Sequence, residues 1–412
     1  MQRYIKIFNT FFYFAQFYAI LTALVLFGLL PSISIKIYLA VYSIFSVVVL
    51  HYSIISNTKN FSVNKFNVFF LLLLCFSLLL SFDLKFLDIS ELSLFLMFTV
   101  QLFIGTHLFL NQEDSLFTKL KTTAFISILL FFFVIATSNF DIAFILNRGY
   151  TWTPYFALYG LCWVIPAFLL YSLILEKSLK LSFICTIIYL IWSAIFLKRG
   201  PVISIIIVLS LYLLHLLRTK QPGRSLLFIL MFSLVTLSAF TFFFDTIIAF
   251  LDAYTNRLSF SNGLQEIPRV HELVTVLESL KTYQKFIGSG LLNSLYFYED
   301  GRHAQERHFL HIGYFFLHLK FTLVFTFYLF ICLAKLLILY VYRYGQIASQ
   351  LRLNLLIYFY IKLLWENLYS FNLEFAIFIG LTVWCFNCRL NKPVNKNTNS
   401  KSLIDLKFAV TR

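Results

Sequence analysis

The chain has 412 residues, of which 60% are hydrophobic and only 12% charged, and its formal net charge is +15 at pH 7. Soluble domains use roughly 45–50% apolar and about 25% charged residues, so this composition excludes an ordinary soluble enzyme, a disordered chain and a disulfide-rich secreted module. The mean hydropathy of +0.84 predicts a protein whose solvent is mostly lipid.

Long apolar stretches follow one another along almost the whole chain. A membrane-spanning helix needs about 20 apolar residues, and about twelve stretches approach that length. Because a helix satisfies its own backbone hydrogen bonds in hydrocarbon, they predict an all-α polytopic membrane protein with one integral membrane domain over residues 1–412. The expected spans lie near residues 9–30, 35–55, 66–82, 91–110, 122–138, 154–175, 179–197, 201–217, 226–251, 312–341, 352–370 and 373–388.

Lysines and arginines are distributed unevenly between the two sets of loops. Nineteen lie in one set and in the C-terminal tail, against five in the opposite short loops. By the positive-inside rule, this bias places both termini and the basic tail, residues 389–412, in the cytoplasm. The positive charge then faces anionic headgroups of membrane lipid, so no nucleic-acid partner is expected. The five opposing cations are Lys36, Lys85, Arg148, Lys198 and Arg199.

Residues 252–311 form a large external loop between the ninth and tenth expected spans. Pro268 favours the first turn of a short amphipathic helix, which is followed by a turn at residues 286–291. An aromatic and charged run then leads to His311. Loops of this length are uncommon unless they carry function.

Two short external segments combine a cation with a glycine. Lys198-Arg199-Gly200-Pro201 precedes a span, where a helix N-terminus and a guanidinium fork suit phosphate oxygens. A snorkelling basic anchor at a helix end explains the same residues. The other segment contains Arg148, and an ordinary interfacial loop is the competing interpretation there.

Three elements, in this order, resemble the bacterial oligosaccharide repeat-unit polymerases of the O-antigen polymerase and ligase superfamily. Lys198-Arg199-Gly200 at the start of a span is similar to that family's Ser-Arg-Gly motif. Arg269 with the later Gly288-Ser289-Gly290 resembles its loop pattern of an arginine, a short helix and Gly-x-Gly. His311 with Tyr314 resembles the His-Asn motif that closes the loop.

The sequence departs from the family pattern at three positions. Ile312 stands where the family usually has asparagine, Thr322 where it has glycine, and Lys198 where it has serine.

The resemblance implies a glycosyltransferase of the bacterial inner membrane that acts at the periplasmic face. Its substrate is an undecaprenyl-pyrophosphate-linked oligosaccharide, which it polymerises into O-antigen, capsule or another surface polysaccharide. Undecaprenyl pyrophosphate is the leaving group. A chain-length regulator is a further partner that the resemblance implies, and no cofactor is expected.

The resemblance also assigns roles to individual residues. Arg199 and Arg269 stabilise the departing pyrophosphate, because developing charge needs preorganised donors. His311 is the candidate base, with His308 as its rival, since neutral imidazole suits proton transfer near pH 7. No Asp-x-Asp pair occurs, so no metal is expected. The expected substrate-binding residues are Arg148, Lys198, Gly200, Gly288, Gly290 and Tyr314.

Two other functions fit the same sequence. A ligase of the same superfamily would transfer the finished glycan to a lipid A core. A flippase or transporter of lipid-linked sugar would place charges inside its spans, and Lys320, Lys362 and Glu366 are the candidates for such a path.

Overall fold

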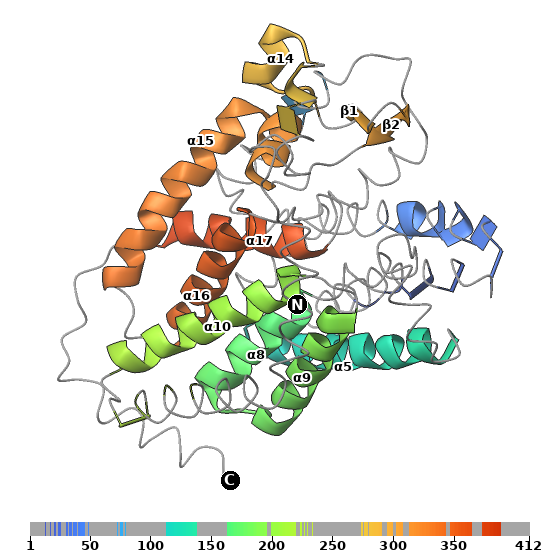
Figure 1. Ribbon diagram of the computed structural model, residues 1–412. Coiled ribbons are helices and arrows are strands. Elements are labelled where there is room, and N and C mark those ends of the chain that lie inside the picture. Colours follow the sequence, from blue (N-terminus) through green and yellow to red (C-terminus); the bar gives the residue numbers. More distant parts are fainter. Residues whose placement is uncertain are drawn as a thin grey trace, which may run out of the picture.

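A computed structural model describes about half of the chain. The described residues are positions within 13–48 and 72–79, then 113–137, 163–195 and 199–219, and positions within 223–233 and 273–280. They continue through 281–290, 295–299, 302–307, 313–342, 347–364 and 373–388. In these segments the chain is mainly helical (Figure 1).

Most of the described helices coincide with apolar stretches that were expected from the sequence to be helical. Four of them match expectation closely: α9 (Leu179–Ile195), α10 (Arg199–Arg218), α15 (Gly313–Tyr342) and α17 (Leu373–Asn387). Pro201 lies in the first turn of α10, as its fixed φ favours. The remaining expected spans, and the bounds of the external loop, lie largely outside the described residues.

Two helices begin earlier than their apolar runs suggest. Helix α5 (Glu113–Thr137) includes Lys119 and Lys121, which were expected in a loop before a span at 122–138. Helix α16 (Ile347–Lys362) likewise includes Arg352 and ends well before the predicted residue 370. The cations of both helices therefore belong to helical turns and not to loops.

Helix α8 (Val164–Leu175) lies at the centre of the described bundle. Every side chain from Val164 to Ile174 is buried, and the helix contacts α5, α9, α10 and α16 (Figure 1). A helix that is apolar around its whole circumference needs neighbours on every side. Trp163, just before α8, packs on Phe359 of α16 with their ring centroids 6.2 Å apart.

The outer surfaces of the long helices are apolar, which indicates a membrane protein. Among the described residues, three helices are long and apolar enough to cross a membrane, over Leu116–Phe133, Pro201–Arg218 and Gly313–Val341. Along α15 the exposed side chains recur at helical spacing and form a continuous apolar stripe. The stripe consists of Leu323, Val324, Phe327, Phe330, Ile331, Leu337, Ile338 and Val341.

Helix α15 is divided by a kink at Thr322, whose φ and ψ are 80° and 164°. Residues 323–342 after the kink extend about 30 Å at about 1.5 Å per residue, which equals the thickness of the hydrocarbon core. The part of α15 after the kink is therefore long enough by itself to cross the hydrocarbon core.

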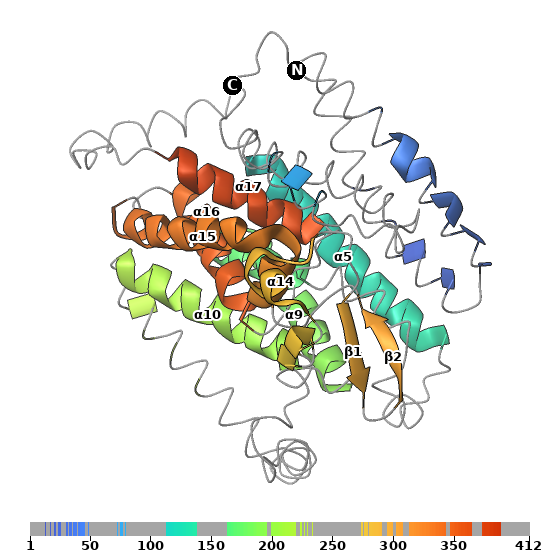
Figure 2. The same ribbon diagram turned by 90° about the horizontal axis from the view of Figure 1, so that it is seen from above.

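In the part of the chain that the structure describes, one β-hairpin stands among the helices and is a local exception to the all-α expectation. Strand β1 (Leu295–Glu299) pairs antiparallel with β2 (Arg302–Arg307), and Glu299 lies opposite Arg302 (Figure 2). An aromatic and charged run of the external loop was expected in this region. Asp300-Gly301 joins the strands, and Asp-Gly between two runs is a strong hairpin signal.

A buried ion pair joins α16 to α17. Lys362, the last residue of α16, binds Glu374 in the first turn of α17, and their side chains are only 5% and 3% exposed. A cation at a helix C-terminus and an anion at an N-terminus each complement the helix dipole. The pair lies where α16 ends and α17 begins.

Removing one partner of this pair should destabilise the protein. Lys362→Met leaves the Glu374 carboxylate buried without its cation, and loss of one partner of a buried pair costs about 3–5 kcal/mol. We expect a lowered midpoint of thermal unfolding in detergent. The double variant Lys362→Met with Glu374→Leu should recover most of the loss, because no buried charge is left over.

The matched control is the exposed ion pair between Arg224 and Glu176, whose side chains are 59% and 57% exposed. Arg224→Ala should change the midpoint little, since exposed pairs contribute little. Equal effects of Lys362→Met and Arg224→Ala would contradict a structural role for the buried pair.

Candidate functional site

The predicted Gly-x-Gly motif forms a turn that docks on α15. Short helix α14 (Thr282–Ile287) ends at Gly288, and the turn 288–290 follows (Figure 1). The amides of Ser289 and Gly290 donate to the Leu319 carbonyl at 2.7 and 3.2 Å, and the Ser289 hydroxyl donates to it at 3.2 Å. Residues 286 and 287, expected in the turn, belong to α14.

Glycine is required at position 288 for two physical reasons. Its φ of 107° is one that other residues rarely adopt. A Cβ atom there would lie 2.9 Å from the Leu319 carbonyl oxygen and 3.1 Å from that of His318. The turn can approach the backbone of α15 this closely only because Gly288 has no side chain.

The backbone of α15 is strained at the docking point. With φ 80° and ψ 164°, Thr322 occupies a region that is essentially restricted to glycine and that costs about 1–3 kcal/mol for other residues. Its hydroxyl is buried and has no hydrogen-bond partner in the part of the chain that the structure describes. The surrounding contacts must therefore hold this conformation.

His318 connects α14 to the far side of the kink. Its Nε2 lies 2.9 Å from the Lys285 carbonyl, which can only accept, so Nε2 donates. Its Nδ1 lies 3.2 Å from the hydroxyl of Thr326, one turn beyond the kink. His318 thus joins α14 and both parts of α15.

The same part of α15 contacts the ends of two other helices. The Tyr314 hydroxyl donates to the Tyr360 carbonyl of α16 at 3.0 Å, and Phe321 stacks on Phe375 of α17 with centroids 5.4 Å apart. Figures 1 and 2 show α15, α16 and α17 side by side. Phe375 follows Glu374 of the buried ion pair. We call this convergence of residues 288–290, 314–322, 360–362 and 374–375 the kink site.

One more charge lies in the kink site. Lys320 precedes the kink by two residues and is 2% exposed. Buried ionisable residues in membrane proteins are costly and commonly mark functional positions. Lys320, Lys362 and Glu374 all belong to the end of α15 before the kink and to the adjoining ends of α16 and α17.

Cations gather at the opposite end of the same helices, which we call the basic end. Arg218 of α10 donates to the Tyr340 carbonyl of α15 and lies 4.2 Å from the Tyr340 ring centroid. The Arg352 guanidinium of α16 lies 5.2 Å from the Trp384 ring. The Lys335 ammonium donates to the Phe386 carbonyl.

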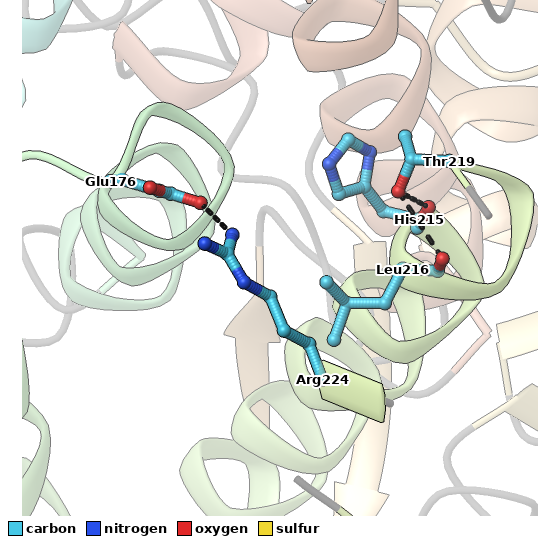
Figure 3. Close-up of polar contacts among 5 residues, drawn as sticks. All are labelled: Glu176, His215, Leu216, Thr219 and Arg224. Carbon is cyan, nitrogen blue, oxygen red and sulfur yellow. Dashed lines mark hydrogen bonds and ion pairs between the residues drawn. The ribbon is translucent and has the colours of Figure 1, made fainter. Parts of the chain in front are cut away.

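Contacts around the end of α10 extend the basic end. Thr219 donates to the His215 carbonyl at 2.9 Å and to that of Leu216 at 3.2 Å, which satisfies acceptors at the helix C-terminus (Figure 3). Nearby, Arg224 pairs with Glu176, the residue that ends α8 (Figure 3). Cations at helix C-termini complement the helix dipole.

The structure places part of the predicted site. Because Arg218 lies at the basic end, α10 begins at Arg199 toward the other end, and Gly200 lies inside its first turn. Gly288 and Gly290 have a structural role in docking, and the Tyr314 hydroxyl is engaged by α16. The side chain of Arg199 and all of Arg148, Lys198, Arg269, His308 and His311 lie outside the described residues.

Sequence reasoning missed two residues of the kink site. His318 lies within an apolar run, where its link to the Lys285 carbonyl leaves no sequence signal. Glu374 did leave a sequence signal, because a lone carboxylate at the start of an apolar stretch needs a partner.

The groups described in the kink site are engaged with one another and build a support for the segments joined to it. In the sequence, His311 lies two residues before α15, and Arg269 lies upstream of α14. No protein-family model, curated protein or solved structure matches the chain.

Proposed function

We propose that this protein is an inner-membrane glycosyltransferase that polymerises undecaprenyl-pyrophosphate-linked oligosaccharide repeat units at the periplasmic face. A hydroxyl of the acceptor unit attacks the anomeric carbon of the donor glycan. The bond between that carbon and the pyrophosphate oxygen breaks, and undecaprenyl pyrophosphate leaves. The growing chain thereby moves onto the incoming unit.

The docked turn at residues 288–290 is the observation that supports this proposal most. The motif resemblance places Gly288-Ser289-Gly290 in the loop that His311 closes, ahead of a long helix. Gly288 has the positive φ that needs glycine, and the turn binds that helix through the Leu319 carbonyl. Gly288 and Gly290 therefore belong to a defined turn that is docked on α15, and their spacing is not a coincidence.

The distribution of charge supports a membrane-surface reaction over transport. Lys320 lies next to the kink, and Lys362 and Glu374 lie at helix ends. A transporter of an anionic lipid would place such groups near the bilayer midplane. The described cations at the basic end fit the cytoplasmic surface that the positive-inside rule predicts.

The proposed chemistry needs charge stabilisation and a proton acceptor. Arg199 and Arg269 would hold the pyrophosphate oxygens as negative charge develops on them. Arg148, Lys198 and Gly200 would add cation and backbone contacts to the same group. His311 would accept the proton of the acceptor hydroxyl, with His308 as the other candidate.

Loss of either arginine should abolish chain extension. We expect Arg199→Ala and Arg269→Ala each to slow polymerisation by about 10²–10³-fold, as for removal of an oxyanion donor. The measurement is polysaccharide chain length in cells, with membrane insertion checked by immunoblot. Arg224→Ala is the matched control, because its exposed side chain lies at the basic end, and it should leave the length unchanged. Normal long chains in both arginine variants would overturn the assignment.

The same cells separate the three candidate functions. Loss of a polymerase leaves one repeat unit on the acceptor core, whereas loss of a ligase leaves none. Loss of a flippase also leaves none and retains the lipid-linked unit on the cytoplasmic side. Only the first pattern agrees with the proposal.

The candidate base can be identified by replacing each of the two candidate histidines with alanine in turn. We expect His311→Ala to lose chain extension severely and His308→Ala to retain most of it, because His311 adjoins the docked start of α15. Chain length in cells is again the readout. If His308→Ala is the inactive variant, the base is His308 and not His311.

A further inference from the structure

The Leu319 carbonyl has two alternative sets of donors. In an uninterrupted α-helix it would accept from the amide of Leu323, four residues later. The ψ of 164° at Thr322 turns that amide away from the helical path. The amides of Ser289 and Gly290 and the Ser289 hydroxyl approach the carbonyl instead.

We propose that the Leu319 carbonyl changes its hydrogen-bond donors between two states of a latch. In the docked state Thr322 is kinked and the turn 288–290 is bound. In the released state Thr322 takes helical dihedrals, Leu323 donates to Leu319, and the turn leaves α15. The latch controls whether the loop segments on either side of the turn are held against the helices, and it does not depend on the proposed function.

Thr322 favours release. A β-branched residue is strained at this φ and ψ, whereas the same residue fits a helix. Its hydroxyl, buried and without a partner among the described residues, could donate in a helix to the carbonyl four residues earlier, that of His318. Straightening α15 would therefore relieve strain and satisfy a buried hydroxyl together.

The turn and α14 favour docking. Gly288 fits only because it lacks a Cβ, and the His318 ring holds the Lys285 carbonyl at 2.9 Å. Release would break these contacts as well as three donations to Leu319. Strain at Thr322 therefore opposes the hydrogen bonds of the docked turn, and a latch requires the two states to lie within a few kcal/mol of each other.

Hydrogen–deuterium exchange of the full chain in lipid nanodiscs tests the latch directly. Thr322→Gly removes the strain of the docked state, so the Ser289 and Gly290 amides should exchange roughly tenfold more slowly and the Leu323 amide faster. Gly288→Ala introduces a clash with the Leu319 carbonyl, so the turn amides should exchange at least about tenfold faster and Leu323 more slowly.

Two controls use the same substitutions elsewhere. A Cβ atom added to Gly223 would meet open space, so Gly223→Ala should leave all three amides unchanged. Thr122→Gly, on helix α5, should also leave the exchange rates of the Ser289, Gly290 and Leu323 amides unchanged. Opposite changes at the turn and at Leu323 in Thr322→Gly support the latch. Changes in the same direction at both places, or no change, would overturn it, and this result does not require Gly288→Ala to fold.

Discussion

The kink of α15 at Thr322 is the constraint on which the rest of this end of the protein depends. By interrupting the helix, it makes the Leu319 carbonyl available to the turn 288–290. It also divides α15 into a membrane-length part, residues 323–342, and a short part that contacts α14, α16 and α17. One non-helical residue thus separates the part of α15 that binds the turn from the rest of the helix.

The two ends of the bundle differ in how they use charge. At the basic end, cations contact carbonyl groups and aromatic rings, as Arg218 does with Tyr340. At the kink site, Lys362 and Glu374 neutralise each other in a nearly water-free environment and lock two helix ends together. The buried Lys320 adds a further cation to the kink site.

Much of the helical architecture could be predicted from the sequence, because apolar runs bounded by polar residues fix helices such as α9 and α17. Tertiary contacts decide the remainder. Lys119 is buried within α5, although its charge suggested a loop. Thr322 breaks no local helical pattern, and only the family resemblance, in which glycine usually stands at this position, pointed to an unusual backbone there. Of the candidate site, Gly288 and Gly290 were recognised, whereas His318 acts through a contact that no local pattern reveals.

The central claim is that this chain alone joins lipid-linked repeat units. Its most direct test supplies the purified protein, in proteoliposomes, with the lipid-linked repeat unit extracted from cells that lack it, and measures glycan length and released undecaprenyl pyrophosphate. The account predicts a ladder of longer glycans with one carrier released per linkage formed. A product that stays at one repeat unit, with no carrier released, would contradict it.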